Sequence, residues 1–225
     1  EMCIRDRYNT LHIMMKKVVI ITGASRGFGE LIAKKFHKEN FQVIATMRNI
    51  DSSPSLKKLN NVDIKKLDVT LKSDIKNVID FTVQKYGRID ILINNAGYGA
   101  FGFLEEASEK EIRNQFDVNF FGLIDCIRAV LPQMRKQRDG VIINISSIAG
   151  RFGLPFTSLY NSSKFAVEGL TECLHYELSL FGIDIKTVAP GSFRTGFHDS
   201  INYTESEKKE DLGDIREKLK IALEE

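Results

Sequence analysis

Residues 17–29 read KVVIITGASRGFG, a short β-branched apolar run followed at once by three glycines. A run of this length is typical of a strand covered on both faces, and the glycines allow a tight turn at its end. Such a turn brings the amide groups that open the next helix close to a pyrophosphate, so we expect dinucleotide binding here rather than a plain strand-to-helix turn. The residues expected to hold the phosphates are Gly23, Ser25, Arg26, Gly27, Phe28 and Gly29.

The same alternation of short strands and longer helical patterns continues along the chain. The expected strands cover 17–22, 42–46, 63–67, 89–93, 141–146 and 184–189. The expected helices cover 27–39, 73–86, 108–137, 158–181 and 204–224, with Ser73 as an N-cap and Gly87 as a C-terminal stop. Alternating strands and helices predict an α/β, Rossmann-type, doubly wound parallel sheet with helices on both faces, as a single domain over residues 14–225.

Composition excludes several classes of protein. The 32 basic and 30 acidic residues of the 225 give a net charge of +2, which indicates no nucleic-acid partner. No apolar run approaches the roughly 20 residues that span a bilayer. The cysteines and histidines show no metal-site or hydrolase spacing, so we expect reduced core thiols, surface or packing histidines and a cytoplasmic protein. These residues are Cys3, Cys126, Cys173, His12, His37, His175 and His198.

Both ends of the chain depart from the globular pattern. Residues 1–13 carry no hydrophobic periodicity, and we expect a non-native or disordered leader before Met14 or Met15. Residues 204–225 read as a charged amphipathic helix that stops without a cap. We therefore expect a C-terminally truncated fragment that lacks its last strand, with low stability or weak activity because a strand edge is unpaired.

Residues after the second strand bear on the choice of coenzyme. An acidic side chain at this place would bind the ribose of NAD, whereas a cation suits the 2′-phosphate of NADP. Arg48 stands there and Arg26 could flank the same phosphate, which favours NADPH over NADH. Asp51 lies nearby in a loop, and the alternative is that Arg48 is a solvated surface charge.

Further polar and small residues follow the other strands, where ligands bind in such sheets. Asp68 and Val69 form a polar–apolar pair that could hold adenine. The small residues Ala96 and Gly97 leave room for the coenzyme. Pro190 and Gly191 turn the chain, and Thr195 could bind the carboxamide. The asparagines of NNAG, Asn94 and Asn95, could bond to neighbouring strand ends, with a structural turn as the alternative. The expected contacts are Asp68, Val69, Asn95, Ala96, Gly97, Pro190, Gly191 and Thr195.

Together, TGASRGFG, NNAG, Ser147, the pair Tyr160 and Lys164, and the segment Pro190–Thr195 resemble the short-chain dehydrogenase/reductase family in its classical form, over about residues 16–197. The resemblance implies Tyr160 as proton donor or acceptor, Lys164 as its activator and contact of the nicotinamide ribose, and Ser147 as the hydroxyl that orients the substrate. It also implies that Asn119 completes the catalytic group. Met47-Arg48 resembles the NADPH-preferring, hydroxysteroid dehydrogenase or carbonyl reductase branch, and family members associate as homodimers or homotetramers.

The spacing of the tyrosine and lysine has a physical reason. Residues four apart are neighbours on a helix face, and an ammonium about 4 Å from a phenolate contributes roughly 4 kcal/mol at an effective dielectric of ~20. We therefore expect Lys164 to lower the pKa of Tyr160 toward neutrality. The alternative is a buried ring beside a lysine. Asparagine is a poor residue within a helix, so Asn119 predicts a strained or kinked turn near 119–120, unless it is only a satisfied polar group between helices.

The motifs together predict an NADP(H)-dependent oxidoreductase that acts on a small carbonyl or secondary-alcohol substrate. A nucleotide-responsive binding protein with little turnover is the alternative, and a sugar-nucleotide epimerase is weaker because no separate substrate domain follows. Apolar residues near a substrate loop at about 196–215 indicate a hydrophobic ketone or steroid-like substrate. These residues are Phe152, Leu154, Phe156, Phe193 and Phe197.

Overall fold

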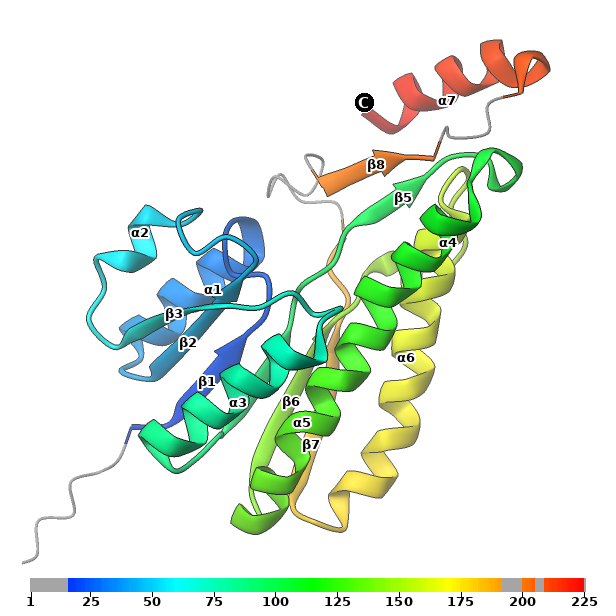
Figure 1. Cartoon of the computed structure of the whole chain (residues 1–225). Coiled ribbons are helices and arrows are strands. Elements are labelled where there is room, and N and C mark those ends of the chain that lie inside the picture. Colours follow the sequence, from blue (N-terminus) through cyan, green and yellow to red (C-terminus); the bar gives the residue numbers. More distant parts are fainter. Residues whose placement is uncertain (1–15, 192–199, 205–208, 225) are drawn as a thin grey trace, which may run out of the picture.

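The computed structural model describes residues 16–191, 200–204 and 209–224. Its core is a six-stranded parallel sheet between helices (Figure 1). The strands are β1 (Val18–Ile21), β2 (Gln42–Met47), β3 (Val62–Lys66), β4 (Ile91–Asn94), β6 (Gly140–Ile145) and β7 (Ile183–Val188). Their order is β3-β2-β1-β4-β6-β7, so the direction of winding reverses between β1 and β4. The predicted Rossmann-type architecture is confirmed.

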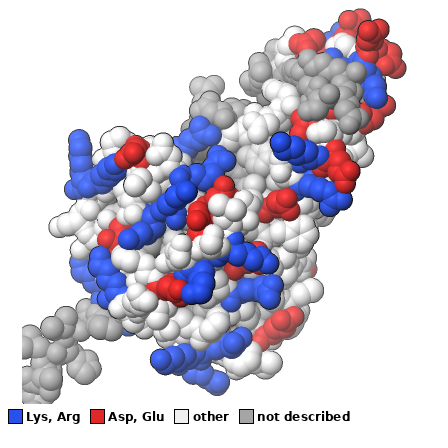
Figure 2. Space-filling view, in the orientation of Figure 1, with Lys and Arg blue, Asp and Glu red and all other residues white. Residues whose placement is uncertain are grey.

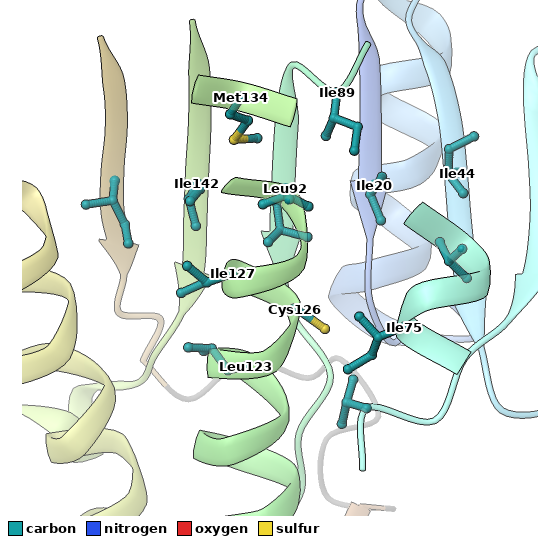
Figure 3. Packing of buried hydrophobic residues seen from close by; sticks show 14 of the residues in the cluster. Ile20, Ile44, Ile75, Ile89, Leu92, Leu123, Cys126, Ile127, Met134 and Ile142 are labelled. Carbon is teal, nitrogen blue, oxygen red and sulfur yellow. The ribbon is translucent and has the colours of Figure 1, made fainter. Parts of the chain in front are cut away.

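Helices cover the sheet on both faces. They are α1 (Gly27–Lys38), α2 (Pro54–Lys57), α3 (Lys72–Tyr86), α4 (Glu109–Phe116), α5 (Gly122–Gln137) and α6 (Ser158–Ser179). Alternate residues of β1 enter opposite layers: Ile20 packs with α3, α5 and α6, and Ile21 packs with α1. Figure 3 shows the first layer, where Cys126 of α5 and Ile75 of α3 lie over the strands.

The strands differ in how completely they are buried. Every residue of β1 and β2 is buried, which confirms the prediction of fully covered strands at the centre. The outer strand β7 alternates between buried and exposed residues, and Val188 is 48% exposed. Successive side chains of a strand point to opposite faces, so the face of β7 that carries Ile183 and Ile185 is covered by α6 and the opposite face is exposed.

The single helix predicted over 108–137 is interrupted. A π-helical turn, η2 (Asp117–Phe121), separates α4 from α5. The expected kink at Asn119 is therefore confirmed, because this residue lies in the middle of the turn. A capping box between Ser108 and Glu111 opens α4, which satisfies backbone donors that the first helical turn leaves unpaired.

The predicted caps of α3 have different outcomes. Gly87 ends the helix in the left-handed conformation, with φ of 71°, as predicted. Ser73 is not the N-cap: the helix begins at Lys72, and Leu71 precedes it without a side-chain cap. The Asp74 carboxylate instead accepts a hydrogen bond from the backbone N–H of Asp68 at 3.1 Å, which ties the first turn to the end of β3.

A small second sheet lies beyond one end of the main sheet (Figure 1) and was not predicted. It pairs β5 (Gly99–Phe101) with β8 (Ile201–Tyr203), followed by η5 (Glu210–Leu212) and α7 (Gly213–Glu224). The buried Arg216 of α7 forms an ion pair with the fully buried Glu106 of η1 (Leu104–Glu106). This pair fixes α7 beside the small sheet.

The composition led to predictions about the surface charge and about the cysteine thiols. Basic and acidic side chains are interspersed on the face shown in Figure 2. Cys126 is buried, and burial raises the pKa of its thiol to about 12, whereas Cys173 is exposed and its prediction as a core thiol is wrong. That side chain lines a cleft between α6 and β7. Across the described ranges, no helix is long and apolar enough to cross a membrane, and no His, Cys, Asp and Glu cluster suits a metal ion.

Several predicted residues lie outside the described part of the chain. They are Cys3, His12, Phe193, Thr195, Phe197 and His198.

Candidate active site

The glycine turn after β1 has a backbone that other residues fit poorly. Gly23 and Gly27 have φ of 67° and 57°, in the left-handed region that favours glycine. A Cβ on Gly23 would lie 2.8 Å from the Cα of Ala96, and one on Gly29 would lie 2.3 Å from the carbonyl oxygen of Gly23. The spacing GxxxGxG is therefore needed to bring the turn, the start of α1 and the end of β4 together.

Hydrogen bonds lock this turn onto the segment after β4. The hydroxyl oxygen of Thr22 accepts hydrogen bonds from the backbone N–H groups of Asn95 and Ala96, both at 3.0 Å. The amide of Asn95 donates to the carbonyl oxygens of Thr22 and Gly23, also at 3.0 Å. The predicted bonding of Asn95 to a neighbouring strand end is confirmed. Asn94 instead donates to the side chain of Asn144 at 2.9 Å. Thr22 was missed, although a hydroxyl that closes an apolar strand signals such a role.

Ser147 and Tyr160 come together although they belong to different elements. Ser147 follows β6 and caps the short helix η3 (Ile148–Gly150), where its hydroxyl accepts a hydrogen bond from Ala149 N–H at 3.1 Å. Tyr160 lies in the first turns of α6, is buried, and forms a side-chain hydrogen bond with Ser147. Its ring lies 5.7 Å from that of Phe101 in β5. The site therefore unites the ends of β6 and β5 with α6.

The pKa of Tyr160 departs from the expectation. Burial raises it, and the hydrogen bond with Ser147 opposes this in part. Burial of a phenol disfavours the charged phenolate. The expected lowering by Lys164 is wrong for this arrangement, because the lysine amine donates to the backbone carbonyl of Ile145 at 2.8 Å and lies 5.7 Å from the centroid of the Tyr160 ring.

Lys164 is itself strongly perturbed. Its side chain is buried, and burial lowers the pKa of the amine to about 8, while the charge of Glu168 acts in the opposite direction. A group with this pKa is mostly protonated at neutral pH, in spite of its burial. Ile145 and Glu168 were not among the predicted site residues, and the acid four residues after Lys164 was the available signal.

Asn119 is held by the backbone of the β4–β5 connection. Its side-chain oxygen accepts from Tyr98 N–H at 3.1 Å, and its amide donates to the Tyr98 carbonyl at 2.9 Å and to the hydroxyl of Ser163 at 3.2 Å. A Cβ on Gly97 would lie 3.1 Å from the Asn119 oxygen and 3.9 Å from the Lys164 nitrogen. The π-helical turn thus brings the end of β4 directly beside Lys164.

The two charged residues after β2 that bear on the choice of coenzyme, Arg48 and Asp51, have different surroundings. Arg48 is exposed, and Asp51 forms an ion pair with Lys57 of α2. Arg26 is also exposed and donates to the hydroxyl of Ser200 at 2.8 Å. The cation at the strand end is therefore accessible, while the nearby acid has a basic partner.

The remaining predicted contacts occupy the same edge of the sheet. Asp68 accepts from Thr70 N–H at 3.0 Å, which forms a local turn, and the buried Val69 packs close to Gly122. Pro190 accepts from Ile148 N–H at 3.0 Å, so the end of β7 is joined to the loop of Ser147. Together with the glycine turn and the close approach of Gly97 to Lys164, these strand ends fit a bound dinucleotide.

A match to a known protein family shows to which family this chain belongs. Residues 17–206 match the model described as short chain dehydrogenase. The chain belongs to the short-chain dehydrogenase family. It is 42% identical to the 3-ketodihydrosphingosine reductase of Bacteroides thetaiotaomicron over 202 residues, which cover 89% of this chain and 73% of that protein.

Solved structures of other proteins have the same architecture. ElxO with NADP bound is 36% identical, with a TM-score of 0.75 over 80% of this chain and 75% of that one. A short chain dehydrogenase/reductase from Burkholderia phymatum in complex with NAD is 30% identical, with a TM-score of 0.79 over 82% and 69%. This short-chain dehydrogenase is thus an oxidoreductase that uses NAD(P)(H), in keeping with the fit at its strand ends.

Aromatic side chains surround the buried tyrosine of this short-chain dehydrogenase. The ring of Phe156 lies 5.2 Å from that of Phe103 and 6.3 Å from that of Tyr203 in β8. Phe101 and Tyr160 belong to one hydrophobic cluster, against which Tyr203 packs. Of the predicted apolar wall, Phe156 belongs to this aromatic group, whereas Phe152 and Leu154 are exposed.

Proposed function

We propose that this short-chain dehydrogenase is an NADPH-dependent carbonyl reductase that acts on a hydrophobic ketone, with Tyr160 as the proton donor. The observation that carries the proposal is the buried phenol of Tyr160, hydrogen-bonded to Ser147 and one helical turn from the buried amine of Lys164. A buried tyrosine hydroxyl needs a hydrogen-bond partner in any protein, so the support comes from the second polar neighbour, the Lys164 amine, which is also buried and lies 5.7 Å from the centroid of the ring.

Each side chain has a role in this proposal. The bound coenzyme supplies the hydride. Tyr160 gives its proton to the carbonyl oxygen of the substrate as negative charge develops there. The hydroxyl of Ser147 donates a hydrogen bond to the same oxygen and so orients it. Lys164 provides positive charge next to the phenol, and Asn119 acts as a positioning residue that holds the Tyr98 backbone beside them.

The raised pKa of Tyr160 supports reduction as the favoured direction. A phenol with a pKa above its ordinary value keeps its proton at neutral pH. This is the form that protonates a developing alkoxide. Oxidation of an alcohol would need the phenolate, which burial disfavours.

The preference for NADPH is supported by the charges after β2. The exposed Arg48 is available for a 2′-phosphate, and Lys57 pairs with Asp51, the acid that would otherwise favour a ribose hydroxyl. We expect Arg48→Asp to raise the Kd for NADPH at least tenfold and to change that for NADH little. Arg128→Asp, a matched change of an exposed arginine on α5, is the control. An unchanged ratio of the two Kd values would remove the case for this contact.

The substrate class is supported by the aromatic surroundings of Tyr160. Phe101, Phe156 and Tyr203 offer apolar surface and no charge to a bound substrate. The relative named as a 3-ketodihydrosphingosine reductase acts, by its name, on a ketone. We therefore propose an apolar ketone, and a steroid-like or long-chain compound fits the same surface.

Self-association is a further part of the proposal. Large apolar side chains are exposed on α6, among them Phe165 at 46% and Tyr176 at 76%. Burial of this surface in a homodimer or homotetramer would stabilise the protein. Light scattering of the purified protein tests it, and a monomer at micromolar concentration would contradict it.

The decisive experiment follows the absorbance of NADPH with a panel of aldehydes, ketones and sterols. We expect Tyr160→Phe to lower kcat/KM at least a hundredfold without loss of fold. Tyr176→Phe, on the same helix, is the control: it removes an exposed hydroxyl and keeps the apolar ring, so it should keep full activity. Turnover by Tyr160→Phe equal to that of the wild type would contradict the proposal and favour a nucleotide-responsive binding protein.

A further inference from the structure

Glu168 is a buried acid whose position is not explained by packing alone. It lies on α6 four residues after Lys164 and is 7% exposed. One carboxylate oxygen accepts a hydrogen bond from the hydroxyl of Thr187 in β7 at 2.9 Å and lies 3.1 Å from the guanidinium of Arg151. The other oxygen is buried and has no hydrogen-bond partner among the residues that the structure describes. Such a group is costly to bury, so its charge requires a reason.

The carboxylate packs directly against the loop that carries Ser147. A Cβ on Gly150 would lie 2.8 Å from the hydroxyl oxygen of Ser146 and 3.1 Å from Cγ of Glu168. Glycine at this position therefore allows the buried acid to approach the end of β6. The hydroxyl of Ser146 is likewise buried without a partner in the described segments. The acid thus lies beside the backbone that positions both Ser147 and the carbonyl of Ile145.

The same neighbourhood contains the amine of Lys164. Its direct hydrogen-bond partner is the neutral carbonyl of Ile145, and Tyr160 keeps its proton at neutral pH. Burial favours loss of the proton from the amine, and Glu168 supplies the negative charge that opposes this loss. The charged or titratable groups around the pair are Tyr160, Glu172, Cys173, His175 and Tyr176 on α6, Arg151 after η3, and Lys186 on β7.

Arg151 connects the acid with solvent. It lines a cleft of about 490 Å³ together with Glu168 and Thr187, between α6 and β7. Its side chain is 56% exposed, whereas that of Glu168 is 9% exposed. A partly solvated cation at this distance neutralises part of the carboxylate charge that acts on Lys164.

We propose that Glu168 is a positioning residue of the reductase, whose buried carboxylate keeps the side chain of Lys164 protonated at neutral pH, and that Arg151 limits this influence from the solvent side. The inference rests on the role proposed for Lys164 in the reduction. No covalent step is involved, since the carboxylate acts through its charge alone.

The test measures the protonation of Lys164 directly. Protein labelled with 13C and 15N in its lysines is titrated by NMR, with the Lys164 signal assigned from Lys164→Met. We expect Glu168→Gln to move the titration midpoint down by about 1 pH unit. Arg151→Gln should move it up by a smaller amount, because the carboxylate charge is then less neutralised. Thr187→Val, which removes a hydrogen bond and no charge, is the matched control and should leave the midpoint in place.

Opposite shifts in Glu168→Gln and Arg151→Gln would support the proposal, since a purely structural role would not produce them. An unchanged midpoint in Glu168→Gln, or an equal shift in Thr187→Val, would overturn it. If Glu168→Gln does not fold, the exposed Arg151→Gln decides by the presence or absence of the upward shift.

Reductase activity, measured on the same proteins as the Lys164 titration, separates this inference from the proposed function. An active wild type whose Lys164 midpoint does not respond would refute the inference alone. A midpoint that responds as expected in a protein without reductase activity would refute the proposed function and leave the relation between Glu168 and Lys164 in place.

Discussion

The buried amine of Lys164 should make the stability of the protein depend on pH in a defined way. Burial lowers its pKa from 10.5 to about 8, which corresponds to about 3 kcal/mol of destabilisation when the amine is protonated in both states. Between these two pKa values the unfolded chain binds a proton that the folded protein has released. The stability contributed at this position therefore rises with pH over that interval.

The perturbation is Lys164→Met, which keeps an apolar side chain of similar length and removes the titrating group. We expect the unfolding free energy of the variant minus that of the wild type to fall by about 2 kcal/mol between pH 7 and pH 9.5, because the wild type gains stability over this range. The loss of the hydrogen bond to Ile145 costs about 1–3 kcal/mol. This cost is the same at both pH values and cancels from the comparison.

Urea unfolding at the two pH values, followed by circular dichroism, measures the effect. Other groups that titrate in this range are common to both proteins, so the difference isolates Lys164. Lys72→Met is the control, because the Lys72 side chain is 79% exposed, and its difference from the wild type should not vary with pH. If the difference for Lys164→Met also stays constant between pH 7 and pH 9.5, the pKa of the Lys164 amine is not lowered in the folded protein. Burial would then not perturb this group as described.

Two further predictions concern packing and charge. Gly29→Ala should lose about 1–3 kcal/mol of stability, because its Cβ would lie 2.3 Å from a carbonyl oxygen. Gly169→Ala, at a helical position where an added Cβ meets nothing within 4 Å, should gain about 0.5–1 kcal/mol. Thermal unfolding measures both changes, and equal effects would contradict the close approach at Gly29. Glu106→Ala should lose about 3 kcal/mol because it removes the carboxylate that pairs with the buried Arg216, whereas Glu109→Ala on the exposed start of α4 should change stability by less than about 0.5 kcal/mol in urea unfolding. Similar small losses in both would show that burial of the pair does not matter.

Much of the fold followed from the sequence because the signals are local. Short β-branched runs and helical periodicity located all six strands of the main sheet to within a few residues. The poor helix propensity of Asn119 located the π-helical turn. The small sheet of β5 and β8 was missed because its strands have three residues each and pair across about a hundred positions, and no periodic pattern is readable in so short a segment.

The sequence by itself determined that the carboxyl ends of the parallel strands share one edge of the sheet, and that Tyr160 and Lys164 lie one turn apart on one helix. Strand ends and helical spacing are properties of the local chain, so motif order was sufficient for this. Only the tertiary structure decided the protonation of the pair. The pKa of Tyr160 is raised and that of Lys164 is lowered because both are buried by elements distant in sequence. Burial and charges acting through space depend on the whole fold, which no spacing of residues records.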